Sequence, residues 1–380
     1  MEGIFFDQYQ TFRCIGPDCP YTCCGGNWTI EIDADSERFY RSCRGSFGAY
    51  LNNNIVRTDG GAHFRLTPSG DCPMLDESGL CRIQTNYGAE HLCETCRLFP
   101  RLTAQRDKTL FLYLSLSCPE AARELLRRRE PLRVLRRDVE LPVKASDPEL
   151  AELRHLTLLT AMDLLQDRGV AIRQRQRLLL LLSRTVQAAL DEGNREEIKK
   201  LLSLFSQPSE YRALAAEIGG TDVASKVAFL RKLSGLFLTE RRERRLPELF
   251  RAAVDDLQAP DADLLAFAAC LAGADSDEQE RGMENLLLGL LPGKYVSAFA
   301  DGDLFRQAIY VLALAQLYRV FAAVEQAAGV HDGDEMRGAA IVAYIDRYFE
   351  HSDAGVRTRF ARLIDEQGLT DLGFLFRLIS

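Results

Sequence analysis

The chain has 380 residues, of which 47% are hydrophobic and 27% are charged, enough apolar material for one large domain or two of common size. Its formal net charge of −8 argues against a general nucleic-acid binder, which is normally basic. No apolar run approaches the roughly 18 residues that cross a bilayer, and the first residues lack the basic start and apolar core of a secretory signal. We therefore expect a cytoplasmic protein with no membrane segment.

Cysteine is distributed unevenly along the chain. Of eleven cysteines, ten lie between Cys14 and Cys118, and Cys270 lies far beyond them in an apolar stretch typical of a buried helix. The odd total fits poorly with a closed set of disulfides, and a reducing compartment keeps thiols available. Because soft thiolates suit zinc and iron–sulfur clusters, this distribution predicts a metal site in the first third of the chain.

The first elements surround a dense group of thiols. The segment from Cys14 to Trp28 holds four cysteines, and the doublet Cys23-Cys24 is followed by Gly25 and Gly26. Glycines at this point would let backbone amides approach a metal centre. Residues 28–32 alternate in the manner of a strand, and Asp33 is a suitable cap for a helix that begins after it.

Three further cysteine groups follow in chain order. Cys72 and Cys81 bound a short loop, Cys93 and Cys96 are separated by two residues, and Cys118 precedes a proline and a helical stretch. Residues 109–116 have the pattern of a second strand. Zinc sites use ligands two to four residues apart, whereas the ferredoxin run of cysteines is missing. Spacing alone leaves zinc and iron–sulfur equally open.

The chain changes character after this region. Residues 1–122 are rich in proline and glycine with short apolar segments, so they are expected to form a small irregular module in which a metal compensates for a thin core. Residues 123–144 are expected to be a linker. We expect the run of basic residues in this linker to be exposed to solvent. From residue 145 onward, amphipathic patterns predict an all-α domain that extends to residue 380.

Helix boundaries are predicted from caps and breakers. Asp147 and Pro148 suit the start of the first helix of this domain. The later helical stretches are expected at 171–192, 195–206, 209–217, 222–238, 261–272, 277–289, 303–327, 334–350 and 354–366. The punctuation between them is assigned to Gly219-Gly220, Pro260, Pro292-Gly293 and Asp332-Gly333-Asp334. The fold class is thus mainly α, with a few short strands in the cysteine-rich module.

The cysteine motifs resemble those of the flagellin lysine-N-methylases. The resemblance rests on short motifs in the same order between residues 9 and about 122, which are Phe12-Arg13-Cys14, Cys19, Cys23-Cys24 before Trp28, Cys72-Pro73, Gly79-Leu80-Cys81, Cys96 before Phe99-Pro100-Arg101, and Ser117-Cys118-Pro119-Glu120. The helical remainder is similar more loosely. Cys43 and Cys93 lie off the recurring pattern, and we expect them to be spare thiols.

The resemblance implies an S-adenosylmethionine-dependent methyltransferase that acts on lysine side chains of flagellin. It also implies a [4Fe-4S] cluster held by cysteines at the matching positions, which are Cys14, Cys19, Cys23, Cys24, Cys72, Cys81, Cys96 and Cys118. Eight thiols exceed the four that one cluster needs. Some are therefore spare, or lie in a second shell, or bind another metal.

The remaining parts of a methyltransferase site are not visible in the sequence. A lysine must lose its proton before it is methylated, and candidate bases near the module are Asp33, Asp71, Asp76, Tyr113 and Glu120. No spacing singles one of them out. The stretch around Gly219-Gly220 lacks a preceding strand, so it predicts a helix end and no nucleotide-binding turn. The S-adenosylmethionine site thus has no assigned residues.

Two other classes of function compete with the enzyme. One is a zinc-stabilised adaptor whose helical domain binds a partner protein, and the other is an iron–sulfur electron-transfer or metal-handling protein. Iron content separates the zinc protein from the other two. Methyl transfer to flagellin separates the enzyme from the electron carrier.

Overall fold

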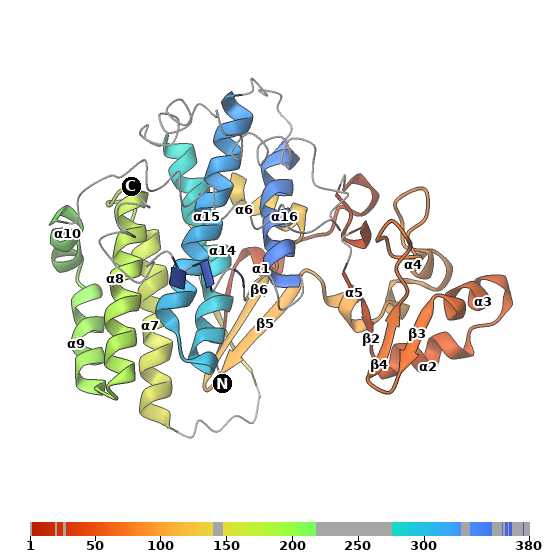
Figure 1. Cartoon of the computed structure of the whole chain (residues 1–380), viewed down its shortest axis with the longest axis horizontal. Coiled ribbons are helices and arrows are strands. Elements are labelled where there is room, and N and C mark those ends of the chain that lie inside the picture. Colours follow the sequence, from red (N-terminus) through yellow and green to blue (C-terminus); the bar gives the residue numbers. More distant parts are fainter. Residues whose placement is uncertain are drawn as a thin grey trace.

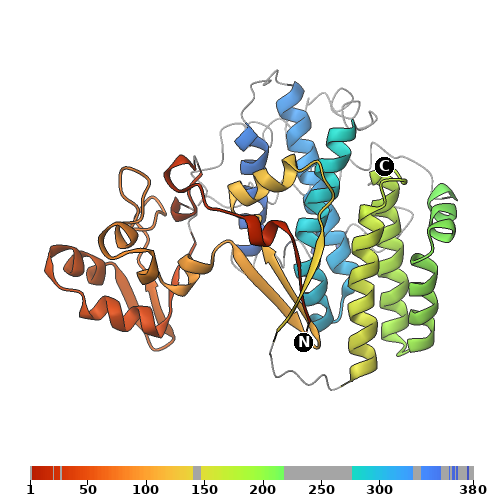
Figure 2. The ribbon, with the colours of Figure 1, turned by 180° about the vertical axis from the view of Figure 1, so that it is seen from behind.

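A computed structural model describes residues 2–19, 21–25, 28–139, 147–217, 276–327 and 335–351, together with single positions between 359 and 375. Figure 1 shows a large helical body joined to a smaller lobe, and Figure 2 shows the same separation from behind. The described residues are mostly helical, and the strands lie in the first 138 residues. The mainly α fold class is confirmed in this coarse form. The structure contains the cysteine-rich region but does not confirm that it binds metal.

A four-stranded sheet lies against the helical body. Its strand order is β5 (Arg101–Arg106), β6 (Thr109–Leu114), β1 (Glu2–Phe6) and β7 (Val134–Asp138). β1 is parallel to β6, with Ile4 opposite Phe111, and the other pairs are antiparallel. Ile4 and Phe6 of β1 and Phe111 of β6 pack into the main hydrophobic core, whereas Phe5, Leu110 and Leu112 form a separate small cluster. The strand expected over 109–116 is confirmed.

The lobe, which we define as residues 28–98, holds a second sheet and four short helices. The antiparallel sheet has the order β2 (Glu31–Ile32), β4 (Gly61–Phe64), β3 (Ile55–Thr58). The helices are α2 (Ala34–Ser42), α3 (Gly45–Asn53), α4 (Arg82–Tyr87) and α5 (Glu94–Leu98). Asp33 caps α2 by accepting a 2.9 Å hydrogen bond from the Ser36 amide, as expected. The strand expected over 28–32 is confirmed only at its end, since β2 covers Glu31–Ile32 alone.

Residues 1–122, expected as one module, contribute to both parts of the molecule. β1 and α1 (Gln8–Thr11) precede the lobe, whereas β5, β6 and α6 (Pro119–Arg127) follow it, and these elements meet beside the helical body. The described part of the expected linker holds the end of α6 and strand β7. Its arginines Arg128 and Arg133 bind the buried Asp7 carboxylate at 2.7 and 3.0 Å. These contacts fix the segment to the sheet.

The helical body agrees with most of the predicted stretches. Its described helices are α7 (Pro148–Gln166), α8 (Ile172–Asp191), α9 (Arg195–Phe205), α10 (Pro208–Glu217), α14 (Asp277–Asp301), α15 (Leu304–Ala327) and α16 (Glu335–His351). Asp147 caps α7 through the Leu150 amide, as expected. The stretches expected at 222–238 and 261–272, most of 354–366, and Cys270 lie outside the described residues. Outside the described residues also lie Gly26 and the expected breakers Gly219-Gly220, Pro260 and Asp332-Gly333-Asp334.

One predicted break is wrong, because Pro292 and Gly293 lie inside α14. A proline within a helix costs roughly 3 kcal/mol. Here the helix is held by burial on several sides, since α14 packs against α6, α7, α15 and both strands of the β5–β6 pair. Gly293 also has a packing role: a Cβ at this position would lie 3.1 Å from the Tyr113 ring of β6. Tertiary packing therefore outweighs the local breaker.

Within the described ranges, none of the helices combines the length and apolarity needed to cross a lipid bilayer.

Candidate cysteine site

Ten of the cysteines lie in described residues, and all ten are free thiols. They divide into two groups by position. The lobe group consists of Cys24, Cys72, Cys81, Cys93 and Cys96, all of which belong to the hydrophobic cluster of the lobe. The junction group consists of Cys14, Cys19, Cys23 and Cys118, which lie where the lobe meets the body.

Backbone contacts bring the lobe group together. The Cys72 amide donates a 2.8 Å hydrogen bond to the Cys24 carbonyl, although 48 positions separate the two residues in the chain. The loop after Cys72 closes on itself through a β-bridge between Leu75 and Cys81. The α5 segment is attached to the same lobe because the Glu94 amide donates to Asp33 and the Thr95 hydroxyl donates to the Glu31 carbonyl. Segments that are distant in sequence therefore present their thiols to one interior.

The lobe thiols are electrostatic neighbours of one another and also of Cys23, whose thiol shares a hydrogen bond with that of Cys24. Burial raises the pKa of Cys72 to about 12, and the nearby thiols of Cys81 and Cys93 act in the same direction. The Cys93 thiol shares a hydrogen bond with Cys96, which lowers the pKa of Cys93 and raises that of Cys96. Cys24 raises the pKa of Cys96 further. Cys93 is thus a buried member of the group, although the motif pattern leaves it out.

The junction group is built from the two ends of the cysteine-rich region. Cys118 is buried beside Phe12 and Ala121, and Phe12 lies two residues before Cys14. Burial raises the pKa of Cys118 to about 12, with Cys23 and Cys19 as the neighbouring thiols. Burial also raises the pKa of Cys19, and the neighbouring Cys23 and Cys14 thiols raise it further. Cys14 is exposed and Cys19 is partly exposed, so this group is more open to solvent than the lobe group.

Helix α16 of the body contributes a cation to the junction group. The Arg347 Nε donates a 2.8 Å hydrogen bond to the Ser117 carbonyl, next to Cys118, and its guanidinium lies 5.2 Å from the centre of the Trp28 ring. A longer hydrogen bond of 3.4 Å reaches the Tyr21 carbonyl, two residues before Cys23. The Arg347 guanidinium has three neighbouring thiols, which raise its pKa: Cys23, Cys118 and Cys19.

The preceding residue, Asp346, fixes the same turn from the other side. Its buried carboxylate accepts hydrogen bonds from the Ser117 hydroxyl at 2.7 Å and the Ser115 hydroxyl at 3.4 Å. Neither Asp346 nor Arg347 was singled out from the sequence. The available signal is an adjacent acid and base directly after the apolar stretch 339–345, because buried charges require partners.

The described ranges hold no group of three or more His, Cys, Asp and Glu side chains in an arrangement that could bind a metal ion. The eight cysteines predicted to bind metal are nevertheless placed, four in the junction group and four in the lobe group. Cys43 also packs against the hydrophobic cluster of the lobe, but its thiol donates to the Phe39 carbonyl at 3.4 Å and we leave it out of the lobe group. Metal binding by these cysteines stays a prediction.

The candidate bases all have structural roles. Hydrogen bonds from the Glu94 and Ser36 amides overcome the opposing effect of burial and lower the pKa of Asp33 to about 2. Asp76 accepts from Ser78 and Leu80 within its own turn, and Glu120 forms an ion pair with Arg123. Asp71 accepts from the Ser69 hydroxyl, and Tyr113 packs on Gly293. The structure therefore favours none of the five as a general base.

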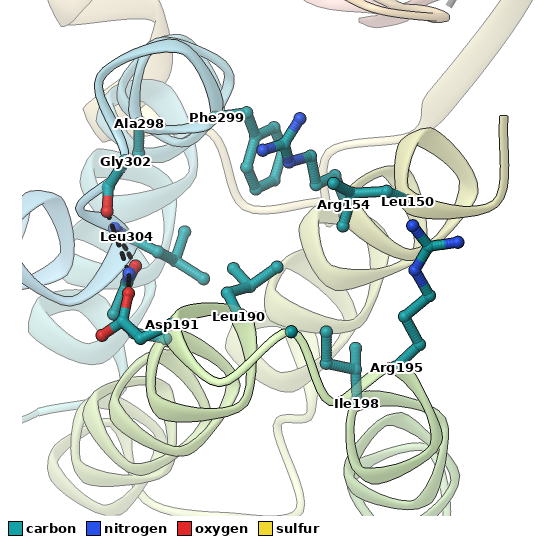
Figure 3. Close-up of a pocket in the computed structure, with 12 residues that line it drawn as sticks. Leu150, Arg154, Leu190, Asp191, Arg195, Ile198, Ala298, Phe299, Gly302 and Leu304 are labelled. Atoms are coloured by element: carbon teal, nitrogen blue, oxygen red, sulfur yellow. Dashed lines mark hydrogen bonds between the residues drawn. The ribbon is translucent and has the colours of Figure 1, made fainter. Parts of the chain in front are cut away.

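A cavity of about 240 Å³ lies elsewhere in the helical body, between the ends of α7, α8, α9, α14 and α15. Figure 3 shows apolar side chains such as Leu190 and Leu304 on its wall, with Arg154 and Arg195 beside them. Both arginines are paired with carboxylates, Arg154 with Asp107 and Arg195 with Glu149. The cavity lining contains no cysteine, so it is separate from both thiol groups.

Comparisons with known proteins place the chain in a family. The FliB lysine N-methylase C-terminal domain matches residues 159–378, more than half of the chain. The flagellar biosynthetic protein FliU of Salmonella muenchen is 34% identical over 121 residues, which cover 30% of this chain and 71% of that protein. No solved structure matches.

Two lysine-N-methylases, from Salmonella typhimurium (strain LT2) and Salmonella choleraesuis (strain SC-B67), are each 33% identical over 129 residues. In both cases the match covers 30% of this chain and 30% of the relative, so this chain spans less than a third of their length. The match to the C-terminal domain includes α16 and Arg347 but begins after the last cysteine of the junction group. This chain belongs to the FliB lysine N-methylase family.

Proposed function

We propose that the chain transfers methyl groups from S-adenosylmethionine to lysine side chains of flagellin and that this activity depends on a [4Fe-4S] cluster held by the N-terminal cysteines. The observation that carries the proposal is the junction itself, where α16 of the FliB-type domain contacts the backbone beside Cys23 and Cys118. The name of the FliU relative, a flagellar biosynthetic protein, supports a flagellar substrate. A cytoplasmic enzyme would meet flagellin before export.

The chemistry of the donor set supports the cofactor. Nine reduced thiols in two neighbouring groups are soft donors of the kind that iron–sulfur clusters and zinc use. The junction thiols Cys14, Cys19, Cys23 and Cys118 provide the number of ligands that one cluster needs. A bound cluster would supply iron with affinity for the amino and carboxylate groups of the methyl donor.

The transfer itself requires a neutral amine. The lysine nitrogen forms a bond to the methyl carbon as the bond from that carbon to the sulfonium sulfur breaks, and the nitrogen then releases a proton. Since a lysine pKa is near 10.4, burial of the amine or a basic group must favour the neutral form. Alignment of the amine with the carbon–sulfur bond supplies a further part of the rate enhancement.

The test is methyl transfer by the anaerobically reconstituted chain. We expect label from the methyl group of the donor to appear on lysines of unmodified flagellin, with an equal amount of S-adenosylhomocysteine. A matched control uses the same preparation after iron removal, in which transfer should fall at least tenfold. Iron-loaded protein that transfers no label would overturn the enzyme proposal and favour an electron carrier. A colourless zinc protein that transfers no label would favour an adaptor.

A further inference from the structure

The cavity of about 240 Å³ in the helical body has an apolar interior and an entrance. The side chains of Ile198, Phe299 and Leu304 line it and are almost completely buried. Asp191 and Gly193 of the turn between α8 and α9 also line the cavity and are exposed, so it opens to solvent at that turn. Sites that bind small molecules combine these two features.

Polar contacts fix the helix ends that form the walls. The Gln187 side chain of α8 donates a 2.9 Å hydrogen bond to the Gly302 carbonyl and accepts one of 2.7 Å from the Leu304 amide. Figure 3 shows these bonds as dashed lines, and they tie α8 to the turn between α14 and α15. At the other end, Arg195 of α9 forms a 2.8 Å ion pair with Glu149 of α7. The cavity is therefore formed by the fold itself, before any ligand binds.

One cation of the lining, Arg154, has hydrogen-bond donors to spare. A guanidinium carries five N–H donors. The described hydrogen bonds of Arg154 use a single nitrogen, Nη1, which donates to the Asp107 carboxylate at 3.0 Å. The two N–H groups of Nη2 remain for a further acceptor. A carboxylate suits them best, because the planar fork of an arginine matches its two oxygens.

The volume of the cavity limits the size of the ligand. An apolar protein cavity of roughly 150 Å³ holds one benzene molecule, so a cavity of 240 Å³ suits a molecule of about ten non-hydrogen atoms. S-adenosylmethionine, an adenosine joined to a methionine, is much larger than this. The ligand of the cavity is therefore a different compound from the methyl donor.

We propose that this cavity binds a small carboxylic acid with an apolar body, whose carboxylate accepts hydrogen bonds from Arg154 and whose body packs on Leu190 and Phe299. Asp191, the acid of the lining, lies across the cavity from Arg154, and its carboxylate accepts a 2.7 Å hydrogen bond from Gln187. The apolar body of the ligand therefore separates the two negative groups. The inference goes beyond the proposed function and does not rest on it, since binding is expected whether or not the chain transfers methyl groups.

The first experiment titrates the full chain with three probes of similar size, which are phenylacetate, the neutral phenylacetamide and the cation phenylethylamine. Ligand-detected NMR measures the affinities. We expect phenylacetate to bind with a Kd in the millimolar range or below, and the other two to bind about tenfold more weakly. Saturating phenylacetate should slow hydrogen exchange at the turns between α8 and α9 and between α14 and α15. Equal affinity for the three probes, no binding of phenylacetate, or protection confined to another part of the chain would overturn the inference.

Variants at the polar end should change affinity in opposite directions. Arg154→Met removes the donors and should weaken phenylacetate binding about tenfold, whereas Arg154→Lys keeps the charge and should recover part of the affinity. Asp107→Asn removes the acid that shares the guanidinium, so phenylacetate should bind more tightly than in wild type. Asn also tolerates the φ of 49° at this position. Weaker binding in both Arg154→Met and Asp107→Asn would overturn the role of Arg154 as the carboxylate's partner.

A change at the apolar end tests the position of the site. Leu190→Phe places a larger side chain in the cavity and should abolish phenylacetate binding. Leu201→Phe, at another partly buried leucine of the body that lies outside the lining, is the matched control and should bind as wild type does. Circular dichroism shows whether both variants fold. Unchanged binding in folded Leu190→Phe would overturn the cavity as the site, and if that variant does not fold, the Arg154 and Asp107 variants decide.

The outcomes are separate from those of the methyl-transfer test. A wild-type chain that binds phenylacetate in the cavity but methylates nothing would keep this site and reject the enzyme. A chain that methylates flagellin but binds none of the probes would keep the enzyme and reject the site.

Discussion

The lobe and the helical body obtain their order by different means. The body has one large core of aliphatic and aromatic side chains from α7, α8, α14, α15 and α16, joined by the inner faces of β1 and β6. The lobe core is small, and thiols such as Cys72 and Cys93 are among its buried members. Apolar area is the main stabilising contribution in folding, so the body can be stable alone, whereas the lobe needs additional links.

The comparison explains why the thiols lie where they do. Cross-links have the greatest value where short strands and helices cannot bury enough surface. The metal that we propose would supply such links through the lobe cysteines. At the junction the same chemistry meets a part of the body that contributes charge, through Arg347.

Removal of metal should produce the largest difference in stability between the lobe and the helical body. Under anaerobic chelation, we expect backbone amides of residues 28–98 to lose protection from hydrogen exchange, because metal binding and folding are coupled in thin-core modules. Amides of α8, α14 and α15 should keep their protection. Simultaneous loss of protection in both parts would show that the body also depends on the metal.

Within the body, the largest single effect is expected at Glu284. Its fully buried carboxylate lies 2.6 Å from Arg175 and 2.9 Å from Arg168. Glu284→Gln leaves the buried Arg175 charge with only the more distant Glu280 carboxylate at 3.4 Å, which should lower the free energy of unfolding by about 3–5 kcal/mol. Chemical denaturation followed by helical circular dichroism measures this change.

The exposed pair of Glu152 and Lys108 provides the matched control for Glu284. Glu152→Gln should lower the free energy of unfolding by less than about 1 kcal/mol, because water screens exposed charges. Equal losses in the two variants would mean that burial of the Glu284 pair has no special role.

A smaller effect is expected at a buried hydroxyl of the lobe. The Tyr40 hydroxyl donates a 2.8 Å hydrogen bond to the His91 carbonyl, close to the start of α5. Tyr40→Phe should destabilise the lobe by about 1 kcal/mol, measured as faster exchange of lobe amides, and should leave the body unchanged. Tyr50→Phe removes a similar bond to the Pro73 carbonyl at a more exposed site, and it should have the smaller effect. The reverse order would contradict the view of Tyr40 as a core contact.

The smallest effect depends on pH and lies in the body. Hydrogen bonds from Arg212, and further bonds from Tyr211 and the Gly169 amide, lower the pKa of Asp167 to about 2, below its usual value of 3.8. The ionised form is therefore favoured by folding, so its stabilising effect is complete above about pH 4 and is lost as the pH falls towards 2.

Thermal unfolding checks this linkage. Asp167→Asn should unfold at a lower temperature than wild type at pH 7, and the difference should shrink between pH 4 and pH 2. Asp35→Asn, at an exposed pair of the lobe, should change little at either pH. A difference for Asp167→Asn that is constant with pH would contradict the assigned cause.

The sequence predicted the body better than the cysteine-rich region. Caps such as Asp33 and Asp147 and the apolar period gave the positions of α2 and α7 to α10, because these signals are local. Pro292 shows where local signals fail: a breaker was overruled by packing of α14 on several neighbours. The sheet was also missed in part, since β1 pairs with a strand more than 100 residues away and no local pattern encodes that partner.

For the candidate site, the sequence indicated which cysteines are candidate ligands. It did not indicate which of these cysteines lie close together. Cys118 and Arg347 are far apart in the chain and come together because α6 and α16 pack side by side. Arg347 was missed for the same reason. Its role depends on which backbone carbonyls lie next to it, and those belong to the other end of the chain.

The chain by itself determined that its front third is rich in thiols, that its remainder is helical and which known family its motifs resemble, because composition, periodicity and short motifs are properties of neighbouring residues. Tertiary structure alone decided which cysteines become neighbours and that Cys118 lies next to α16. Such choices depend on contacts between residues far apart in the chain, and these form only when the sheet and the helices pack together.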